Sequence, residues 1–518
     1  MRILALGSDN FVKPLRALGH EVRLAAPQDG ADLPLTSPDP EWQRLSAAVQ
    51  AKRLNFDAIL VTDDVGRRTL PTGLWAAEAV TVFYGVDAPL NRSWQMSYAR
   101  LFDVALLDQP QEASDLAALH GGAGWLPVGV DLSLYDSPPA PGQVAGVGFV
   151  GVVNEAVRPK RSAILNKIAK RASLRLRGGR QGQWFDTRQA AALYRQCQVV
   201  LNENLFPGVT TRPLEVMAAG GSLLSEAAPG SMDRFFRDGE HLCFFGPDDI
   251  EQKLELLLGS PDLRRRLAEQ GRDQVRQHHG LERRAQDIVR NIELMMAKAI
   301  GERPRARGGE ALRLEGEALL WAGLRWPAQG GRQRLLRAAG RLQAAASDGA
   351  DSLRAARGAG RALLAIGKHD EALSHLRRAW DQGGPADGLV WALAAWEAGQ
   401  GQAARQALAS LGEISAEPGQ ASFHLDMGRR LVELGLDLAP GFNRQGLGMP
   451  LWEGFEHLLK ATSLEPSLAP AWECLGDLLL ARGAANQAHH CLGRARALAD
   501  RPELAAKEAQ AAREGYLT

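Results

Sequence analysis

The stretch Val199–Glu226 carries the residues best suited to hold an anion. Its sequence, VVLNENLFPGVTTRPLEVMAAGGSLLSE, predicts a buried strand that ends at Asn202, then a loop, then a helix opened by a proline. The first turn of a helix exposes backbone N–H groups and the positive end of the helix dipole, which together attract a phosphate. Thr210 and Thr211 add hydroxyl donors there, and Arg212 adds a fixed charge with bidentate geometry. We therefore predict a phosphate site at this helix start, with Asn202 at its edge.

Glu215 lies one turn further along the same predicted helix. Its carboxylate can accept hydrogen bonds from two adjacent sugar hydroxyls, so we include it in the binding site. A second interpretation stays open, in which this is an ordinary strand–loop–helix unit whose Arg212 and Glu215 are simply solvated. No Gly-x-Gly-x-x-Gly or Walker sequence is present to decide between the two.

A second basic cluster follows a predicted strand at Val147–Val150. Gly151 provides a turn after that strand, and the cations Arg158, Lys160 and Arg161 come soon after it. Basic residues at this spacing also suit the solvated face of an amphipathic helix, and that interpretation stays open. If the cluster binds an anion, we favour Arg158 and Arg161 over Lys160.

In the first part of the chain, Asp87 follows an apolar strand in the segment Tyr84–Leu90 (YGVDAPL). A carboxylate at the end of a strand can orient or deprotonate an acceptor hydroxyl, which makes Asp87 a candidate catalytic residue. A turn-forming aspartate before a proline explains the same residue equally well. Gly7, at the end of the first predicted strand, allows a ligand to approach the backbone closely, although a plain tight turn also explains it.

The sequence predicts no metal site. The pair Asp63-Asp64 ends a predicted strand without the partner of a D-x-D motif, and we interpret His278-His279, in a polar helical stretch, as surface residues. The four cysteines are dispersed and form no C-x-x-C pair, so we expect neither a disulfide framework nor a zinc site. They are Cys197, Cys243, Cys474 and Cys491.

Composition narrows the class of protein. With 518 residues the chain can hold about three domains, and 45% apolar against 23% charged residues is typical of a globular protein. The 61 Lys and Arg residues balance 60 Asp and Glu residues, so nucleic acid and anionic membranes are not expected as partners. The N-terminal apolar run is too short for a signal peptide, and no apolar stretch has the length of a transmembrane segment. We therefore expect a cytoplasmic protein.

Short apolar runs alternate with amphipathic, helix-like segments up to the basic linker Arg303–Gly309. The alternation predicts βαβ units and parallel, doubly wound sheets. A Pro- and Gly-containing break at Ser137–Gly142 divides it into two Rossmann-like halves, whose strands would end at a shared cleft. Beyond the linker the sequence is rich in Ala, Leu and Arg and has no convincing strand. We therefore predict two α/β domains at residues 1–137 and 138–302, followed by an all-α domain at residues 310–518.

The last domain contains an internal repeat. Its spacing of small and apolar residues follows the pattern of a tetratricopeptide repeat, in which Gly and Ala let two helices cross closely while Trp and Leu fill the seam. One copy spans Gly360–Pro385, and the clearest copy spans Trp472–Ala495. We expect an insertion between them at Asp437–Pro450. A generic helical bundle is the alternative.

The string Arg212–Gly221 (RPLEVMAAGG), followed by Phe235–Glu240 (FFRDGE), resembles the signature of glycosyltransferases with the GT-B fold. The helical stretch Leu263–Arg284 is similar to the C-terminal helices of the same family. The chain resembles most the CgeB-like branch, which is related to the retaining glycosyltransferase group 1 enzymes. The resemblance is best over residues 145–300 and weaker over residues 1–135. It does not include the repeats, although such enzymes are sometimes fused to tetratricopeptide repeats.

The resemblance implies a GT-B fold, a nucleoside diphosphate sugar as donor substrate, and no cofactor. In that family the helix N-terminus and the Arg at the position of Arg212 hold the diphosphate, and the Glu at the position of Glu215 bonds the ribose. Arg158 and Arg161 occupy the region where such enzymes place cations on the diphosphate, because negative charge builds there as the glycosidic bond breaks. A retaining, metal-independent mechanism follows from the same resemblance. One departure is Pro207, which stands where group 1 enzymes carry an acid and leaves open how the donor sugar is held.

Two functions are consistent with the sequence. The first is a glycosyltransferase whose repeats bind the acceptor, a protein such as flagellin or a surface polysaccharide. The second is a tetratricopeptide-repeat scaffold whose α/β part binds a nucleotide sugar without turnover, which the missing acid at Pro207 favours. We also expect a fragment that ends near Arg303 to fold and to bind donor, but to lose acceptor selectivity.

Overall fold

The computed structural model describes two compact units. One contains Met1–Pro89 and Phe102–Arg305, and the other contains Leu90–Leu101 and Ala306–Thr518. The description covers the chain except residues 38, 64–68, 137–143, 156–157, 179–185, 207, 350, 412–419, 434–453 and 517–518. Four features of the sequence therefore lie outside the described residues: Asp64, Pro207, the predicted break Ser137–Gly142 and the predicted insertion Asp437–Pro450.

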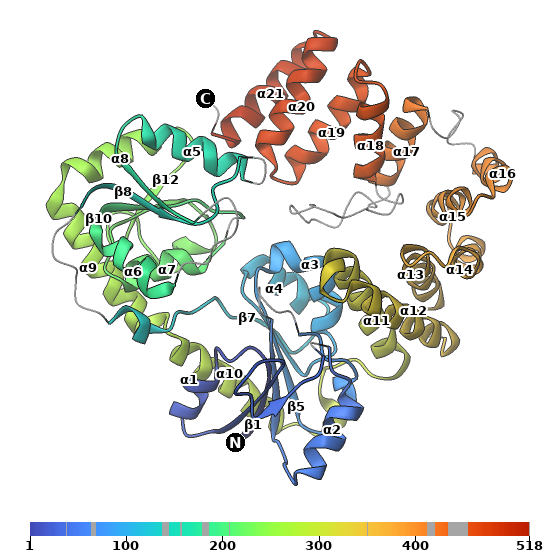
Figure 1. Ribbon diagram of the computed structural model, residues 1–518, viewed down its shortest axis with the longest axis horizontal. Coiled ribbons are helices and arrows are strands. Elements are labelled where there is room, and N and C mark those ends of the chain that lie inside the picture. The colour runs from blue at the N-terminus through green and yellow to red at the C-terminus, as the bar shows by residue number, and fades with distance from the viewer. Residues whose placement is uncertain are drawn as a thin grey trace. The chain divides into compact units, whose positions relative to one another are not determined.

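The first unit contains two separate parallel sheets, as the alternating sequence pattern predicts (Figure 1). The first sheet has the strand order β3-β2-β1-β4-β5-β6-β7, and its paired strands are parallel. The central strands β4 and β5 are buried along their whole length, which is why they are continuous apolar runs in the sequence. The strands are β1 (Arg2–Gly7), β2 (Glu21–Ala26), β3 (Leu33–Pro34), β4 (Ala58–Thr62), β5 (Val80–Gly85), β6 (Val104–Leu107) and β7 (Ala123–Trp125).

Helix α10 (Leu281–Met296) returns the chain to this first sheet. Its apolar stripe of Ala285, Ile288, Ile292 and Met295 is buried in the same core as the side chains of β1, β2, β4, β5 and β6. The chain therefore crosses back to the first sheet after the second sheet is complete. The predicted domain 138–302 instead places this helix with the second sheet. The other helices of this part are α1 (Val12–Ala17), α2 (Trp42–Ala51) and α4 (Pro110–Ala117), with the 3-10 turns η1 (Leu74–Ala76), η2 (Leu132–Tyr135) and η4 (Ile300–Glu302).

The second sheet has the strand order β12-β11-β10-β8-β9 and is also parallel. Apolar side chains of α6, α7 and β10 form one buried core beside it. Its strands are β8 (Val144–Val150), β9 (Leu174–Arg177), β10 (Cys197–Asn202), β11 (Leu223–Glu226) and β12 (Cys243–Phe245). Its helices are α5 (Pro159–Ala169), α6 (Thr187–Gln196), α7 (Thr211–Ala218), α8 (Ile250–Gly259) and α9 (Pro261–His278), with the 3-10 turn η3 (Met232–Arg234).

His279, which directly follows α9, is buried. Its ring centroid lies 4.9 Å from that of Phe235 and 5.1 Å from that of Phe236, and its Nδ1 atom is 2.9 Å from Nη2 of Arg284. Burial lowers the pKa of His279 to about 3, and the charge of Arg284 acts in the same direction. The prediction of a surface pair is therefore wrong for His279, whereas His278 is exposed.

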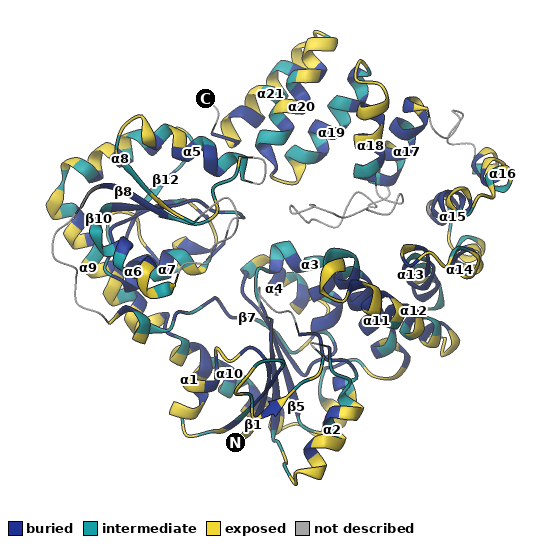
Figure 2. Cartoon of the chain, in the orientation of Figure 1, coloured by how far each residue is buried: buried dark blue, intermediate teal, exposed yellow. Residues whose placement is uncertain are grey.

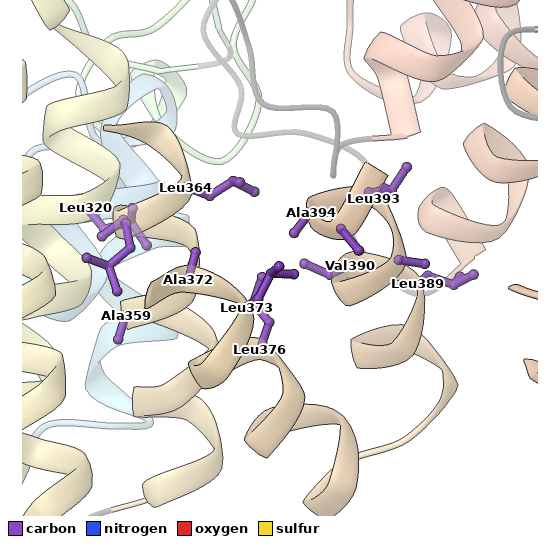
Figure 3. Close-up of a cluster of buried hydrophobic side chains, with 14 of the residues drawn as sticks. Leu320, Ala359, Leu364, Ala372, Leu373, Leu376, Leu389, Val390, Leu393 and Ala394 are labelled. Atoms are coloured by element: carbon purple, nitrogen blue, oxygen red, sulfur yellow. The ribbon is translucent and has the colours of Figure 1, made fainter. Parts of the chain in front are cut away.

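Over its described residues, the second unit is built from helices without a strand. Leucine and alanine side chains of α11 to α17 form one buried cluster, and the helices turn their buried faces toward one another (Figures 2 and 3). The helices are α11 (Gly308–Arg325), α12 (Gly331–Ser347), α13 (Ser352–Ala365), α14 (His369–Gln382), α15 (Pro385–Glu397), α16 (Gly401–Leu411), α17 (Ala421–Glu433), α18 (Gly454–Leu464), α19 (Ala469–Ala481), α20 (Ala485–Leu498) and α21 (Pro502–Glu514), with the 3-10 turn η5 (Pro327–Gln329). None of the helices that the structure describes combines the length and hydropathy of a transmembrane segment.

Glycines let successive helices of this unit cross closely, as the repeat pattern predicts. A Cβ atom added to Gly360 would lie 2.6 Å from Cγ of Leu376, on the next helix. One added to Gly476 would lie 2.7 Å from Cγ of Leu492, again on the next helix. Neither position has room for a side chain. The assignment of these helix pairs to tetratricopeptide repeats stays a prediction.

Helix α3 (Ala88–Ala99) belongs, from Leu90 onward, to the second unit. The rings of Trp94 and Trp326 lie 5.8 Å apart, edge to face. The Ser97 hydroxyl donates to Glu317 Oε2 at 2.8 Å, where Glu317 also pairs with two arginines of the same unit. Trp94 is fully buried. The second unit thus includes a helix that the sequence alone assigns to the first domain.

Candidate functional site

Asn202 joins the carboxyl ends of strands β10 and β11 in the second sheet. Its Nδ2 group donates to Ser225 Oγ at 3.0 Å and to Asn204 Oδ1 at 2.9 Å. Its Oδ1 atom accepts from Nη1 of Arg212 at 3.1 Å. Parallel strands end at the same edge of a sheet, which is the edge where ligands of such sheets bind. Asn202 therefore fixes the position of the Arg212 guanidinium at this edge.

Arg212 and Arg161 share one aromatic ring. The Cζ atom of Arg212 lies 4.8 Å from the ring centroid of Phe149 on β8, and that of Arg161 lies 5.3 Å from the same centroid. Burial lowers the pKa of Arg212, and the neighbouring charge of Arg161 lowers it further. Two neighbouring like charges repel each other, so an anion bound between them would be favoured. The structure brings these two predicted residues together.

Gly151 lets the backbone after β8 approach Arg212. Its φ is +153°, and an added Cβ would lie 2.9 Å from Nη2 of Arg212 and 3.2 Å from the ring of Phe149. Gly178, after β9, packs on Gly151 in turn, since its added Cβ would lie 2.5 Å from the Gly151 carbonyl oxygen. The glycine predicted as a strand-end turn therefore lies directly beside the predicted arginine.

We expect Gly151→Ala to displace the Arg212 guanidinium and to weaken anion binding about tenfold, because the new methyl group and the guanidinium cannot occupy the same space. Gly230→Ala is the matched control: Gly230 also has a positive φ, but nothing lies within 4 Å of its added Cβ. Calorimetric titration with inorganic pyrophosphate measures the effect. Equal affinities for the two variants would contradict the role assigned to Gly151.

Carboxylates pair with two of the predicted cations. Lys160 Nζ lies 3.0 Å from Glu226 Oε2 and donates to the Asn204 carbonyl oxygen at 2.8 Å, and Arg161 Nε lies 2.8 Å from Glu203 Oε2. Burial alone would raise the pKa of Glu203, but the charges of Arg161 and Lys160 lower it overall. The structure therefore ties Lys160 to the end of β11. Glu203 and Glu226 were missed in the sequence, although each stands at a strand end beside the predicted loop.

Arg158 precedes α5 and lies within electrostatic reach of both halves of the first unit. Burial lowers its pKa, the charge of Arg161 lowers it further, and the charges of Glu203 and Asp87 oppose this shift. Asp87 comes from the first sheet, whereas Arg161 and Glu203 come from the second. The two candidate catalytic residues Arg158 and Asp87 therefore share one electrostatic environment.

Helix α7 begins at Thr211, two residues before Pro213, near which the sequence predicts its start, and Thr210 is the residue before its first turn. The Thr210 side chain makes no capping hydrogen bond to this turn, and Thr211 is exposed. Glu215, one turn after Arg212, has its Oε2 atom 3.5 Å from the hydroxyl of Tyr194. Burial raises the pKa of Glu215, and the charge of Arg212 opposes the rise. The geometry places Glu215 close to Arg212, and its contact with a ribose stays a prediction.

Asp108 fixes the backbone at Asp87. Asp87 has φ +50°, and its N–H donates to Asp108 Oδ2 at 2.8 Å, while the N–H of Ala88 donates to Oδ1 at 3.0 Å. Asp108 thereby caps the start of α3. Asp108 is not among the residues predicted from the sequence, although it follows strand β6 just as Asp87 follows β5. That shared position at a strand end is the signal that could have found it.

Asp108 should give the protein a measurable pH dependence. Burial raises its pKa to about 7, and the charge of Asp87 adds to the rise. Because the folded state holds this proton more tightly than the unfolded chain, the stabilisation is complete below about pH 4 and is lost as pH rises through about 7. The Asp108→Asn variant has no carboxyl group to titrate at this position. We therefore expect its Tm to change less between pH 5 and pH 8 than the Tm of the unmodified protein. Parallel Tm curves for the two proteins would contradict this.

Gly7 lies at the carboxyl end of β1 with φ +92°. An added Cβ would lie 3.0 Å from Cβ of Thr69 and 3.5 Å from the carbonyl oxygen of Thr62. These contacts show tight packing within the first half. A part for Gly7 in ligand binding stays a prediction. No group of three metal-ligating side chains occurs in the described part of the chain.

Residues 159–290 match the model of a family described as Glycosyl transferase-like. This segment contains Arg161, Asn202, Arg212 and Glu215, so the described site lies largely within the part of the chain that is similar to glycosyl transferases. A comparison with curated proteins finds no match.

Three solved structures share similarity with the chain at low sequence identity. HepE of Anabaena in complex with UDP-glucose is 13% identical over 57% of this chain and 100% of that chain, with a TM-score of 0.42. Sucrose-phosphate synthase of Thermosynechococcus elongatus is 14% identical over 58% and 100%, with a TM-score of 0.41. The UDP-forming α,α-trehalose-phosphate synthase of Burkholderia vietnamiensis is 12% identical over 57% and 99%, with a TM-score of 0.40.

Proposed function

We propose that the protein is a glycosyltransferase that moves a sugar from a nucleoside diphosphate donor to an acceptor hydroxyl. One observation carries the proposal: Arg161 and Arg212 stack on Phe149 at the carboxyl edge of a parallel sheet. Both arginines lie in the segment that matches the Glycosyl transferase-like family. Negative charge builds on the diphosphate as the glycosidic bond breaks, and fixed cations at that point lower the barrier.

Each site residue has a role in this proposal. Arg212, with the first turn of α7 and the hydroxyls of Thr210 and Thr211, holds the diphosphate. Arg158 and Arg161 stabilise the charge that leaves with it. Glu215 accepts from the ribose hydroxyls, which requires its charged form.

Asp87 orients the acceptor hydroxyl or takes its proton. The mechanism we propose retains the configuration of the sugar and uses no metal or cofactor, because the cations and the helix dipole supply the positive charge. The helical second unit binds the acceptor, a protein such as flagellin or a surface polysaccharide.

Release of diphosphate tests the proposal. The purified full chain is incubated with UDP-glucose, GDP-mannose or dTDP-glucose, first alone and then with a cell lysate as a source of acceptor. We expect one donor to release nucleoside diphosphate, faster in the presence of lysate. Binding of a donor without release in any condition would instead indicate a nucleotide-sugar-binding scaffold.

A further inference from the structure

Gln109 binds both backbone groups of one residue in the opposite half of the first unit. Its Nε2 group donates to the carbonyl oxygen of Val209 at 2.9 Å, and its Oε1 atom accepts from the Val209 N–H at 3.1 Å. Gln109 follows strand β6 of the first sheet, whereas Val209 lies in the loop between β10 and α7 of the second. Both residues are buried, so water has little access to replace these two hydrogen bonds if either partner is removed.

The loop is shaped to receive this amide. A Cβ atom added to Gly208 would overlap Oε1 of Gln109, so only a glycine at this position allows the loop to come so close. Val209 directly precedes Thr210, the residue before the first turn of α7. The position of Gln109 therefore fixes the backbone that leads into the proposed diphosphate site.

The Gln109 amide also contacts Asp108, which supports the backbone of the proposed acceptor-side residue Asp87. Gln109 Nε2 also lies 3.1 Å from Oδ2 of Asp108, the oxygen that accepts the N–H of Asp87. The indole N–H of Trp125 donates to the Asp108 carbonyl oxygen at 3.1 Å and holds this turn from the other side. Hydrogen bonds thus run without a break from the backbone of Asp87, through Asp108 and Gln109, to Val209.

We propose that Asp108 and Gln109 are positioning residues that set the acceptor-side Asp87 and the donor-side start of α7 at a fixed separation. This inference rests on the proposed glycosyl transfer. Transfer requires the acceptor oxygen and the sugar carbon to be held within about 3.5 Å with correct alignment, and a displacement of about 1 Å lowers the rate roughly a hundredfold. A chain of buried hydrogen bonds between the two sides supplies that accuracy.

The two residues should affect different steps. Gln109→Ala frees the loop before α7, so we expect about tenfold weaker donor binding together with a lower kcat. Asp108→Asn leaves the loop contact of Gln109 in place but alters the support of Asp87, so we expect a lower kcat with donor affinity changed less than twofold. A role in stability alone would lower Tm in both variants and leave the donor affinity and the kcat of the folded protein unchanged.

A second pair of variants makes the test independent of simple damage to the fold. Gly208→Ala places a methyl group on the Gln109 amide, so we expect it to weaken donor binding about tenfold as well. In the double variant Gly208→Ala/Gln109→Ala, the new methyl group no longer overlaps an amide. We therefore expect the double variant to have the same donor affinity as Gln109→Ala. Gln111→Ala is the matched control, because Gln111 is exposed and its amide donates to Asp115 of its own helix.

The experiment uses the full chain, calorimetric titration with the donor among UDP-glucose, GDP-mannose and dTDP-glucose that binds most tightly, and a diphosphate-release assay. Two results would overturn the positioning role while leaving the proposed function intact. One is a double variant whose loss of donor affinity is the sum of the two single losses. The other is a Gln109→Ala variant with the same donor affinity and kcat as the Gln111→Ala control. Absence of both binding and release in the unmodified chain would overturn the proposed function and this inference together.

Discussion

Replacing Arg212 with alanine is expected to weaken binding of the nucleoside diphosphate donor by about a hundredfold, because a charge-assisted, bidentate contact to phosphate is among the strongest single contacts available. Asn202 and the ring of Phe149 hold the guanidinium in place before any ligand binds. Little conformational entropy is then lost on binding, which adds to the size of the effect. Calorimetric titration of the full chain with UDP-glucose, GDP-mannose and dTDP-glucose measures it.

Two further variants locate the cause of this loss. Arg212→Lys keeps a positive charge but loses the planar fork and much of the stacking on Phe149, so its affinity should lie between those of the unmodified protein and Arg212→Ala. Arg44→Ala removes an exposed arginine that pairs with Glu41 and lies outside the site, and should bind donor normally. If Arg44→Ala lost as much affinity as Arg212→Ala, net charge rather than the site would explain the result.

The second large effect concerns a chain that ends at Arg305. We expect it to aggregate or to melt at least about 10 °C lower than the full chain, because helix α3 loses its partners in the second unit. Trp94 and Tyr98 are buried, and each large aromatic side chain exposed to water costs about 2 kcal/mol or more. Ser97 loses its hydrogen-bond partner Glu317, and Arg100 loses its ion-pair partner Glu310. Light scattering and thermal melting report the outcome.

A chain that ends at Leu411 is the control for this truncation. It keeps helices α11 to α16, including Trp326 and Glu317, and removes α17 together with the helix α18 on which α17 packs. We expect it to remain monodisperse and to bind donor as the full chain does. A well-folded, donor-binding fragment ending at Arg305 would show that α3 does not need the helical unit.

Much of the fold follows from local patterns. The apolar runs at Met1–Leu6 and Ala58–Thr62 predict strands because both faces of a parallel sheet are covered, and both are strands in the structure. The strand–loop–helix around Arg212 can likewise be predicted, since a proline lies in the first turn of the helix and a glycine pair follows the helix. In the site, Arg161, Gly151 and Arg212 come together as expected because each stands at the end of a strand or in the helix after it.

The rest depends on pairings between distant residues that no local period contains. Gln109 and Val209 are 100 residues apart, and nothing near either residue predicts the other. Lys160 reads as a free cation until the fold brings Glu226 to it, 66 residues away. The same reason explains why the sequence predicts that a fragment ending near Arg303 folds by itself: Leu90–Leu101 has the sequence of an ordinary crossover helix, and only the structure groups it with α11.

The membership of α3 in the helical unit also constrains the evolutionary history of the chain. A free-standing first unit would need a polar outer face on α3, because that face would be exposed to water. If a gene fusion had only added helices after residue 305, α3 would still have this polar face. Trp94 and Tyr98 are buried, and Trp94 contacts Trp326 edge to face, so we expect that this face changed together with α11. Relatives that lack the helical region should therefore carry polar residues at the positions of Trp94 and Tyr98, and relatives that keep it should carry large apolar ones.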